Sequence, residues 1–216
     1  MRVSGVLLAA GASTRFGSPK MLAPVGEDGT PLLQTVCETW LEAGIDDLLI
    51  VLGCGAADIR ARLEENLLRK VNGKESAAAA VRFVENPRWH AGMFSSVKAG
   101  LAATAADSTH IAISPADLPF LSKKSLRRVL SAVSALDAGG LSLAAPTHAG
   151  RRGHPLLIPA ALRSRLLSWP DSARLNQIFD EPDVTVHSLE GFDDTILRDV
   201  DSPSDLLASR SSSFSL

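Results

Sequence analysis

A loop near the start of the chain combines small residues with two positive charges. Residues 8–20 read LAAGASTRFGSPK. Small residues allow backbone N–H groups to approach a ligand closely, and successive amides can form a concave site for an anion. Beside them, Arg15 offers a bidentate contact to a phosphate, and Lys20 offers a point charge. The loop therefore favours a phosphate site, although a solvated turn with two surface cations also fits its composition.

The spacing of this segment excludes two common phosphate loops. The Walker loop ends in Gly-Lys-Ser/Thr, and this loop does not. The dinucleotide fingerprint needs glycine at three fixed positions, and after Gly11 two of them hold Ser13 and Phe16. A phosphate site here must therefore be of another kind.

Two aspartates follow predicted strands and are candidates for a divalent metal site. Asp117 comes after the run His110–Ser114, and Asp201 comes after the run Ile196–Val200. Both runs predict strands, and the carboxyl ends of parallel strands meet at one edge of a sheet. Because carboxylate oxygens suit Mg²⁺, we expect the two side chains to share one ion. The alternatives are that Asp117 is only a turn residue and that Asp201 only caps the last helix.

Further polar residues lie at the ends of predicted elements. Ser95 and Ser96 begin a predicted helix, where hydroxyls and free amides could hold a base, a ribose or a phosphate, or could merely cap the helix. His154 follows Gly153 and precedes an apolar run. It is the histidine that we expect in the site, as a contact to an acceptor or a phosphate, with a structural turn as the alternative.

Alternating strands and helices must position these residues. This order is the signature of an α/β fold with a mostly parallel, doubly wound, Rossmann-like sheet. Irregular strands after residue 140 suggest some antiparallel pairing there. We expect a single domain over residues 1–208 and a frayed tail over residues 209–216. The predicted strands are 6–10, 47–53, 80–84, 110–114, 141–146, 184–189 and 196–200, and the predicted helices are 31–43, 56–69, 93–105, 123–136, 159–168 and 171–180, with a short last helix from 203.

Composition excludes several classes of protein. The chain has 216 residues, of which 45% are hydrophobic, and 22 basic residues face 24 acidic ones. This balance is that of a globular protein, and it provides no strong field for nucleic acid or an anionic membrane. The two cysteines, Cys37 and Cys54, form no metal-type pair and are interpreted as reduced residues. We therefore expect a cytoplasmic protein with neither a nucleic-acid nor a membrane partner.

Five segments, in this order, resemble the MobA-like NTP transferases, above all the molybdenum-cofactor cytidylyltransferase type. One departure is Ser202, which stands where threonine is usual in the family. Together the five segments extend over nearly the whole chain. They are residues 8–20, the segment NPRWHAGMFSSV at 86–97, DLP at 117–119, GRRGHP at 150–155, and DVDSPSDL at 199–206.

The resemblance implies an Mg²⁺-dependent nucleotidylyltransferase with the nucleotide-diphospho-sugar transferase fold. In this family the first loop wraps the triphosphate, and the residues that match Arg15 and Lys20 neutralise the departing pyrophosphate. The catalytic residues would then be Arg15, Lys20 and Asp117. The implied nucleotide-binding residues are Leu8, Ala9, Ala10, Gly11, Arg15, Lys20, Ser95, Ser96 and Asp117, the acceptor-binding residues are Gly153 and His154, and the metal ligands are Asp117 and Asp201.

The resemblance also favours one nucleotide and one acceptor. The pair Ala9-Ala10 resembles the cytidylyl type, because guanylyl relatives usually carry glycine at the second position. The favoured reaction is CMP transfer from CTP to molybdopterin or its molybdenum form, with transient contact to a molybdoenzyme. Guanylyl transfer to the same pterin and transfer to a sugar or polyol phosphate remain open. So do a non-catalytic nucleotide- or cofactor-binding protein and, least favoured because the glycine fingerprint is missing, a Rossmann-type oxidoreductase.

Overall fold

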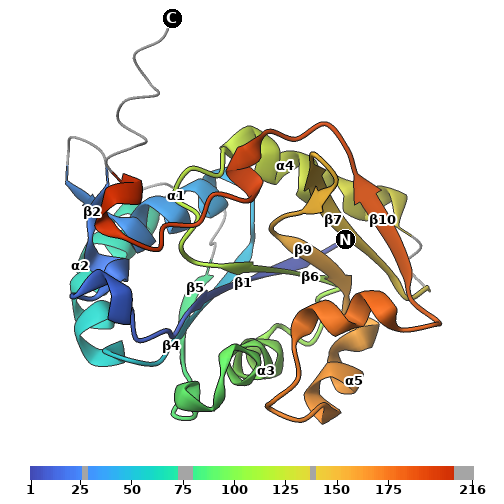
Figure 1. The fold of residues 1–216 in the computed structure, drawn as a ribbon, viewed down its shortest axis with the longest axis horizontal. Coiled ribbons are helices and arrows are strands. Elements are labelled where there is room, and N and C mark those ends of the chain that lie inside the picture. Colours follow the sequence, from blue (N-terminus) through green and yellow to red (C-terminus); the bar gives the residue numbers. More distant parts are fainter. Residues whose placement is uncertain (26–28, 73–79, 137–139, 207–216) are drawn as a thin grey trace, which may run out of the picture.

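A single α/β domain is built around one central sheet (Figure 1). The computed structural model describes residues 1–25, 29–72, 80–136 and 140–206. The tail expected over residues 209–216 lies outside the described residues. Among the described helices, none is long and apolar enough to cross a membrane.

The strand order of the central sheet is β10-β7-β9-β6-β1-β4-β5. Strands β1, β4, β5 and β6 run parallel, β9 is antiparallel to both β6 and β7, and β10 is parallel to β7. The mostly parallel sheet and the antiparallel pairing after residue 140 are therefore confirmed. The strands are β1 (Val3–Ala9), β4 (Asp47–Leu52), β5 (Ala80–Glu85), β6 (His110–Pro115), β7 (Ser142–His148), β8 (Arg151–Arg152, paired with β7), β9 (Leu156–Pro159) and β10 (Thr185–Leu189), with β2 (Pro24–Val25) and β3 (Thr30–Pro31) in a separate pair.

Helices cover both faces of the sheet. Figure 1 shows α1 (Leu32–Ala43), α2 (Ala56–Asn72) and α4 (Lys123–Ser131) on one side, and α3 (Met93–Ala103) and α5 (Arg163–Ser168) on the other. Short 3₁₀ helices connect these layers. They are Thr14–Phe16, Lys20–Leu22, Trp89–Ala91, Ala132–Ala135, Ala160–Leu162, Leu175–Asp180 and Asp194–Ile196.

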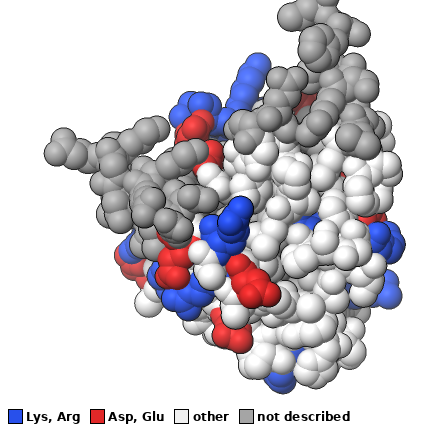
Figure 2. All heavy atoms as spheres, turned by 90° about the vertical axis from the view of Figure 1, so that its left-hand side faces the viewer, with Lys and Arg blue, Asp and Glu red and all other residues white. Residues whose placement is uncertain are grey.

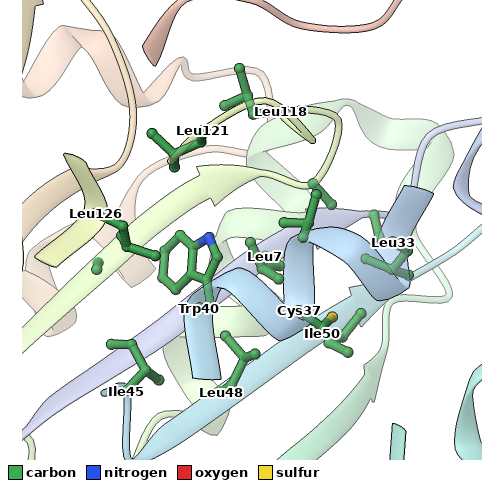
Figure 3. Packing of buried hydrophobic residues seen from close by; sticks show 14 of the residues in the cluster. Leu7, Leu33, Cys37, Trp40, Ile45, Leu48, Ile50, Leu118, Leu121 and Leu126 are labelled. Carbon is green, nitrogen blue, oxygen red and sulfur yellow. The ribbon is translucent and has the colours of Figure 1, made fainter. Parts of the chain in front are cut away.

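Alternating residues of the central strands fill the two halves of the core. In β1, Leu7 packs with α1, whereas Val6 packs with α3 on the opposite face. Trp40 of α1 is fully buried against the sheet (Figure 3). A Cβ atom at Gly5 would lie 2.8 Å from Trp40 Cζ3, so a glycine in β1 leaves the space that the indole fills. The sheet is thus packed on both faces by a hydrophobic core.

The strand predicted over 196–200 is wrong. The side chain of Asp193 accepts a hydrogen bond from Thr195 N and caps a 3₁₀ turn instead. The carbonyl oxygen of Ile196 then accepts a hydrogen bond from His154 N, which lies outside any strand pairing. Apolar residues there bury against the core without joining the sheet, and the sequence pattern alone does not distinguish these outcomes.

Two predicted helices also differ in detail. The helix expected over 171–180 is a 3₁₀ helix at 175–180. The helix expected over 123–136 is α4 followed by a 3₁₀ turn. Ser122 caps α4, because its hydroxyl accepts a hydrogen bond from Ser125 N at 3.1 Å.

Candidate active site

The loop after β1 lines a cavity at the carboxyl edge of the sheet. Ser13 and Gly17 adopt left-handed backbone conformations with φ of 52° and 71°, and these let the loop turn back on itself around a 3₁₀ helix. The cavity has a volume of about 310 Å³. It is lined by Leu8, Ala9, Ala10, Gly11, Ser13, Thr14, Arg15, Phe16, Lys20, Met21, Trp89, Met93, Ser96, Pro115, Asp117 and Asp201.

Four charged side chains converge in this cavity. Lys20 Nζ lies 2.8 Å from Asp117 Oδ2 and 3.9 Å from Asp201 Oδ1. These distances place the two carboxylate oxygens no more than about 7 Å apart. Arg15 Nη1 lies 2.7 Å from Asp201 Oδ2. The structure therefore brings together two cations and two carboxylates that are up to 186 residues apart in the sequence.

Asp201 reaches the cavity by a route that the sequence did not predict. Val200 N donates a hydrogen bond to the carbonyl oxygen of Asp117 at 2.9 Å, which joins the two segments directly. The carboxylate of Asp205 accepts hydrogen bonds from Asp201 N and Ser202 N. Hydrogen bonds from Ser202 hold the pKa of Asp205 below its ordinary value. Asp205 therefore caps the last helical turn, and the carboxylate of Asp201 points to Arg15 and Lys20.

The carboxylate of Asp117 has the features expected of a metal ligand. Its Oδ1 atom is buried and has no hydrogen-bond partner among the described residues. A buried carboxylate oxygen without a partner is costly unless something else binds it. Within the described part of the chain no three His, Cys, Asp or Glu side chains cluster as a metal site. The protein thus offers two carboxylates, and Mg²⁺ commonly takes one or two together with water and substrate phosphates.

Only one of the two expected serines faces the cavity. Asn86 Nδ2 donates to Ser95 Oγ at 2.8 Å and to Ser96 Oγ at 3.0 Å. Ser95 Oγ also lies within hydrogen-bonding distance of the carbonyl oxygens of Arg88 and Gly92. Ser96 lines the cavity and Ser95 does not. The hydroxyl of Ser95 fixes the turn before α3, and a contact of Ser95 with the nucleotide stays a prediction.

A second cavity of about 640 Å³ adjoins the first and contains His154. The two cavities share Leu8, Met93 and Pro115 in their linings. The Nδ1 atom of His154 is buried and has no hydrogen-bond partner among the described residues. Burial lowers the pKa of His154, and the nearby carboxylates of Asp117 and Asp199 oppose this effect. The imidazole is therefore neutral near pH 7.

Gly153 does not reach either cavity. A Cβ atom there would lie 2.5 Å from the carbonyl oxygen of Ile196, so the two backbone segments touch. Gly153 N also donates to the carbonyl oxygen of Pro146 at 2.8 Å. The small size of Gly153 allows the close packing that positions His154, and a contact of Gly153 with an acceptor stays a prediction.

Several lining residues were missed by the sequence reasoning. Trp89 and Met93 line the first cavity, and Asp199 lines the second. All three stand inside segments that resemble the family, so that signal could have found them. Residues 171–176 form one wall of the second cavity. They lie outside the segments that resemble the family, so there was no reason in the sequence to expect them there.

An ion-paired aspartate holds this wall against the rest of the site. Asp171 Oδ2 lies 2.9 Å from Arg88 Nη1, and Asp171 Oδ1 lies 3.1 Å from Lys98 Nζ. Lys98 Nζ also donates to the carbonyl oxygen of Trp169 at 2.8 Å. The wall is thus joined both to α3 and to the turn that carries Trp89.

Charge outside the site is mixed. On the face drawn in Figure 2, positive and negative side chains of the described residues are interspersed, and much of the remaining surface is uncharged. Binding of an anionic ligand therefore depends on the local charges of the cavity.

Comparison with known proteins identifies the family. The pattern of the MobA-like NTP transferase domain matches residues 5–186. The chain belongs to this family. It is also 36% identical to the nicotine blue oxidoreductase of Paenarthrobacter nicotinovorans over 179 residues, which cover 77% of this chain and 75% of that protein. A relative of similar sequence is therefore named for a redox activity.

Solved structures confirm the nucleotidyltransferase fold. A nucleotidyl transferase from Methanothermobacter thermautotroptrophicus (Mth528) has a TM-score of 0.74 and 22% identity, and covers 98% of this chain and 97% of that one. Rv0371c from Mycobacterium tuberculosis H37Rv has a TM-score of 0.71 and 23% identity, with complete coverage of both chains. A complex of Rv0371c with manganese has a TM-score of 0.65 and 22% identity, and covers 96% of this chain and 97% of that one.

Proposed function

We propose that this protein transfers a nucleoside monophosphate from a nucleoside triphosphate, preferably CTP, to a phosphorylated acceptor and releases pyrophosphate. The observation that carries the proposal is the convergence of Arg15, Lys20, Asp117 and Asp201 on one cavity. A cationic loop opposite paired carboxylates is the arrangement needed to hold a triphosphate together with a divalent cation. Membership of the MobA-like family supports the same reaction class.

The residues of the first cavity divide the work between the phosphates and the nucleoside. Arg15 and Lys20 bind the β- and γ-phosphates and stabilise the charge that develops on the departing pyrophosphate. Backbone amides around Gly11 would contact the phosphates, and Ser96 and Trp89, which line the same cavity, would contact the ribose and base. A preference for CTP rests on the Ala9-Ala10 pair, which resembles the cytidylyl type.

Asp117 and Asp201 would hold Mg²⁺. When bound, this ion reduces the repulsion between the anionic reactants and fixes the α-phosphate for in-line attack. The unpartnered Oδ1 of Asp117 supports this assignment, and the manganese complex of Rv0371c is consistent with a divalent cation on this fold. A phosphate monoester is already ionised near pH 7, so the acceptor needs no general base.

The second cavity suits the acceptor. It shares Leu8, Met93 and Pro115 with the lining of the first cavity, and its own lining is mostly apolar around His154 and Asp199. A volume of about 640 Å³ accommodates a drug-sized ring system. We therefore favour molybdopterin or its molybdenum form over a sugar or polyol phosphate as the acceptor. This choice of acceptor is the same for cytidylyl and for guanylyl transfer. Location in the cytoplasm and transient delivery to a molybdoenzyme follow from that acceptor.

Release of pyrophosphate tests the reaction. The wild-type protein, Mg²⁺, molybdopterin and each of CTP, GTP, ATP and UTP are combined, and we expect CTP to give the fastest release. Asp117→Asn should lower the rate by about a thousandfold, because it removes a metal ligand at the reacting phosphate. Asp107→Asn, which alters an exposed ion pair with Arg2 away from the cavity, should not change the rate. Undiminished activity in Asp117→Asn would refute the assignment.

A redox activity is the second candidate, and the relation to the nicotine blue oxidoreductase is the observation that favours it. The second cavity has the size and apolar lining for a planar aromatic substrate. Titration with NADH and NADPH distinguishes the candidates. Saturable binding with hydride transfer to an aromatic dye, and no pyrophosphate release from any triphosphate, would replace the transferase proposal.

A further inference from the structure

Lys20 lies where a metal ion shared by the two carboxylates would have to bind. Its ammonium nitrogen is 2.8 Å from Asp117 Oδ2 and 3.9 Å from Asp201 Oδ1. Mg²⁺ binds carboxylate oxygens at about 2.0–2.1 Å and Mn²⁺ only slightly farther out. Because two like charges about 4 Å apart repel strongly in a partly buried site, the ammonium and the metal cannot occupy this place together.

Replacing the ammonium of Lys20 by a metal ion has an electrostatic cost that the metal alone does not offset. The side chains of Lys20 and Asp117 are only 12% and 19% exposed. Separating them leaves a partly buried ammonium without an anion, which is strongly unfavourable. A metal ion supplies Asp117 with a new partner but supplies none to Lys20. A metal ion that arrives with a triphosphate supplies both, because a phosphate oxygen can accept the ammonium.

We propose that Lys20 couples metal binding to nucleotide binding by this exchange of ionic partners. Without nucleotide, Lys20 neutralises the carboxylate pair and keeps its affinity for a divalent cation low. With nucleotide, Lys20 moves to the phosphates and frees Asp117 and Asp201 for the metal. Arg15 makes the same exchange at Asp201, with a smaller effect because its side chain is 76% exposed.

The inference rests on the proposed function, because a phosphate must receive Lys20. It also predicts the reciprocal effect, since coupling between two ligands is the same in both directions. The metal therefore raises the affinity for the nucleotide. A site with low affinity for free metal also stays without a bound cation while no substrate is present.

Binding of Mn²⁺ alone tests the inference without any turnover. Free Mn²⁺ is measured by electron paramagnetic resonance during titration of the wild type and of Lys20→Met, with no nucleotide present. We expect Lys20→Met to bind Mn²⁺ about tenfold more tightly, because the competing ammonium is gone. Adding Asp117→Asn to Lys20→Met should abolish that gain. An affinity for Mn²⁺ in Lys20→Met equal to or weaker than that of the wild type would overturn the inference.

Two control variants separate this exchange from a general loss of positive charge. Lys98→Met removes another partly buried lysine paired with an aspartate, at 3.1 Å, and should leave the affinity for Mn²⁺ unchanged. Lys20→Arg keeps the charge and should bind Mn²⁺ as weakly as the wild type. An equal gain in Lys98→Met would overturn the inference. If circular dichroism shows that Lys20→Met does not fold, Lys20→Gln takes its place in the same titration.

Calorimetry of CTP with the wild type keeps this inference distinct from the proposed function. If CTP does not bind with or without Mn²⁺, the proposed function fails, and the coupling fails with it. If CTP binds normally while Lys20→Met shows no gain in affinity for Mn²⁺, only the coupling fails.

Discussion

Pairs of identical residues in and next to the candidate site differ in what surrounds them. A Cβ atom at Gly11 would meet nothing within 4 Å, whereas one at Gly153 would lie 2.5 Å from the backbone of Ile196. Ser96 faces the cavity, and Ser95 is bonded within its own turn. Residue type and spacing could select these positions from the sequence. The direction in which each residue faces depends on distant segments of the chain, and no local sequence pattern carries that information.

Gly11→Ala tests whether the first loop contacts a ligand. The structure has room for the added methyl group, which would stand at the cavity surface where the phosphates are proposed to bind. We expect the melting temperature to stay within about 2 °C of the wild type, and the affinity for CTP to fall about tenfold or more. Thermal melts and calorimetry measure both quantities.

Gly153→Ala provides the contrast. Its methyl group would collide with the carbonyl oxygen of Ile196, so the melting temperature should fall by several degrees. Unchanged CTP affinity in Gly11→Ala would mean that the nucleotide does not approach this backbone.

At the scale of elements, the central strands were the most predictable part of the fold. β1 and β4 each contain a short continuous apolar run, which is the pattern of strands buried on both faces. The segment 196–200 is interrupted by two charged residues and lies outside the sheet, because its backbone bonds go to His154 and Asp117. The prediction that Asp201 lies near Asp117 is confirmed, although the strand that was to bring it there is absent from the described residues.

The wall of the second cavity depends on an ion pair between elements. Asp171 → Asn removes the charge that holds Arg88 and Lys98. The segment 171–176 is then less firmly fixed, so we expect the KM for the acceptor to rise about fivefold while the KM for CTP changes little. Steady-state pyrophosphate release at varied acceptor and varied CTP separates the two constants.

Asp183→Asn is the matched control for this variant. Asp183 also forms a short pair, at 2.7 Å with Arg165, but it lies outside both cavities. Neither KM should change in this variant. A rise in the KM for CTP equal to that for the acceptor in Asp171→Asn would show that the ion pair does not act on the acceptor wall.

At the scale of the whole molecule, buried histidines make stability depend on pH. His110 lies in β6 and is 1% exposed. Burial lowers its pKa from the ordinary value of 6.5, so the unfolded chain binds a proton there more readily than the folded protein does. The free energy of unfolding is therefore fully retained above about pH 6.5 and decreases as the pH falls below that value. The lowered pKa of His154 acts in the same direction.

Thermal melts between pH 7.5 and about 5.5 measure this dependence above the range in which carboxylates titrate. We expect the melting temperature of the wild type to fall across this interval. His110→Asn should flatten the profile, and His187→Asn, which changes an exposed residue of β10, should not. A wild-type profile without slope would contradict the role of the buried histidines.

The candidate active site also belongs to the whole molecule, because its four charged residues come from the beginning, the middle and the end of the sequence. Arg15 and Lys20 follow β1, Asp117 follows β6, and Asp201 comes from the segment after β10. The sequence could name these residues because their types suit phosphate and metal chemistry. Their meeting in one cavity required the sheet order that places β6 beside β1.

A crystal structure with CTP and Mn²⁺ tests the central claim most directly. The anomalous signal of manganese locates the ion independently of the protein. We predict one ion within about 2.3 Å of a carboxylate oxygen of both Asp117 and Asp201, with the triphosphate on the loop at residues 11–20 and Lys20 bonded to a phosphate. A nucleotide bound elsewhere, or one in the cavity with Lys20 still between the two carboxylates and no manganese on them, would contradict the account.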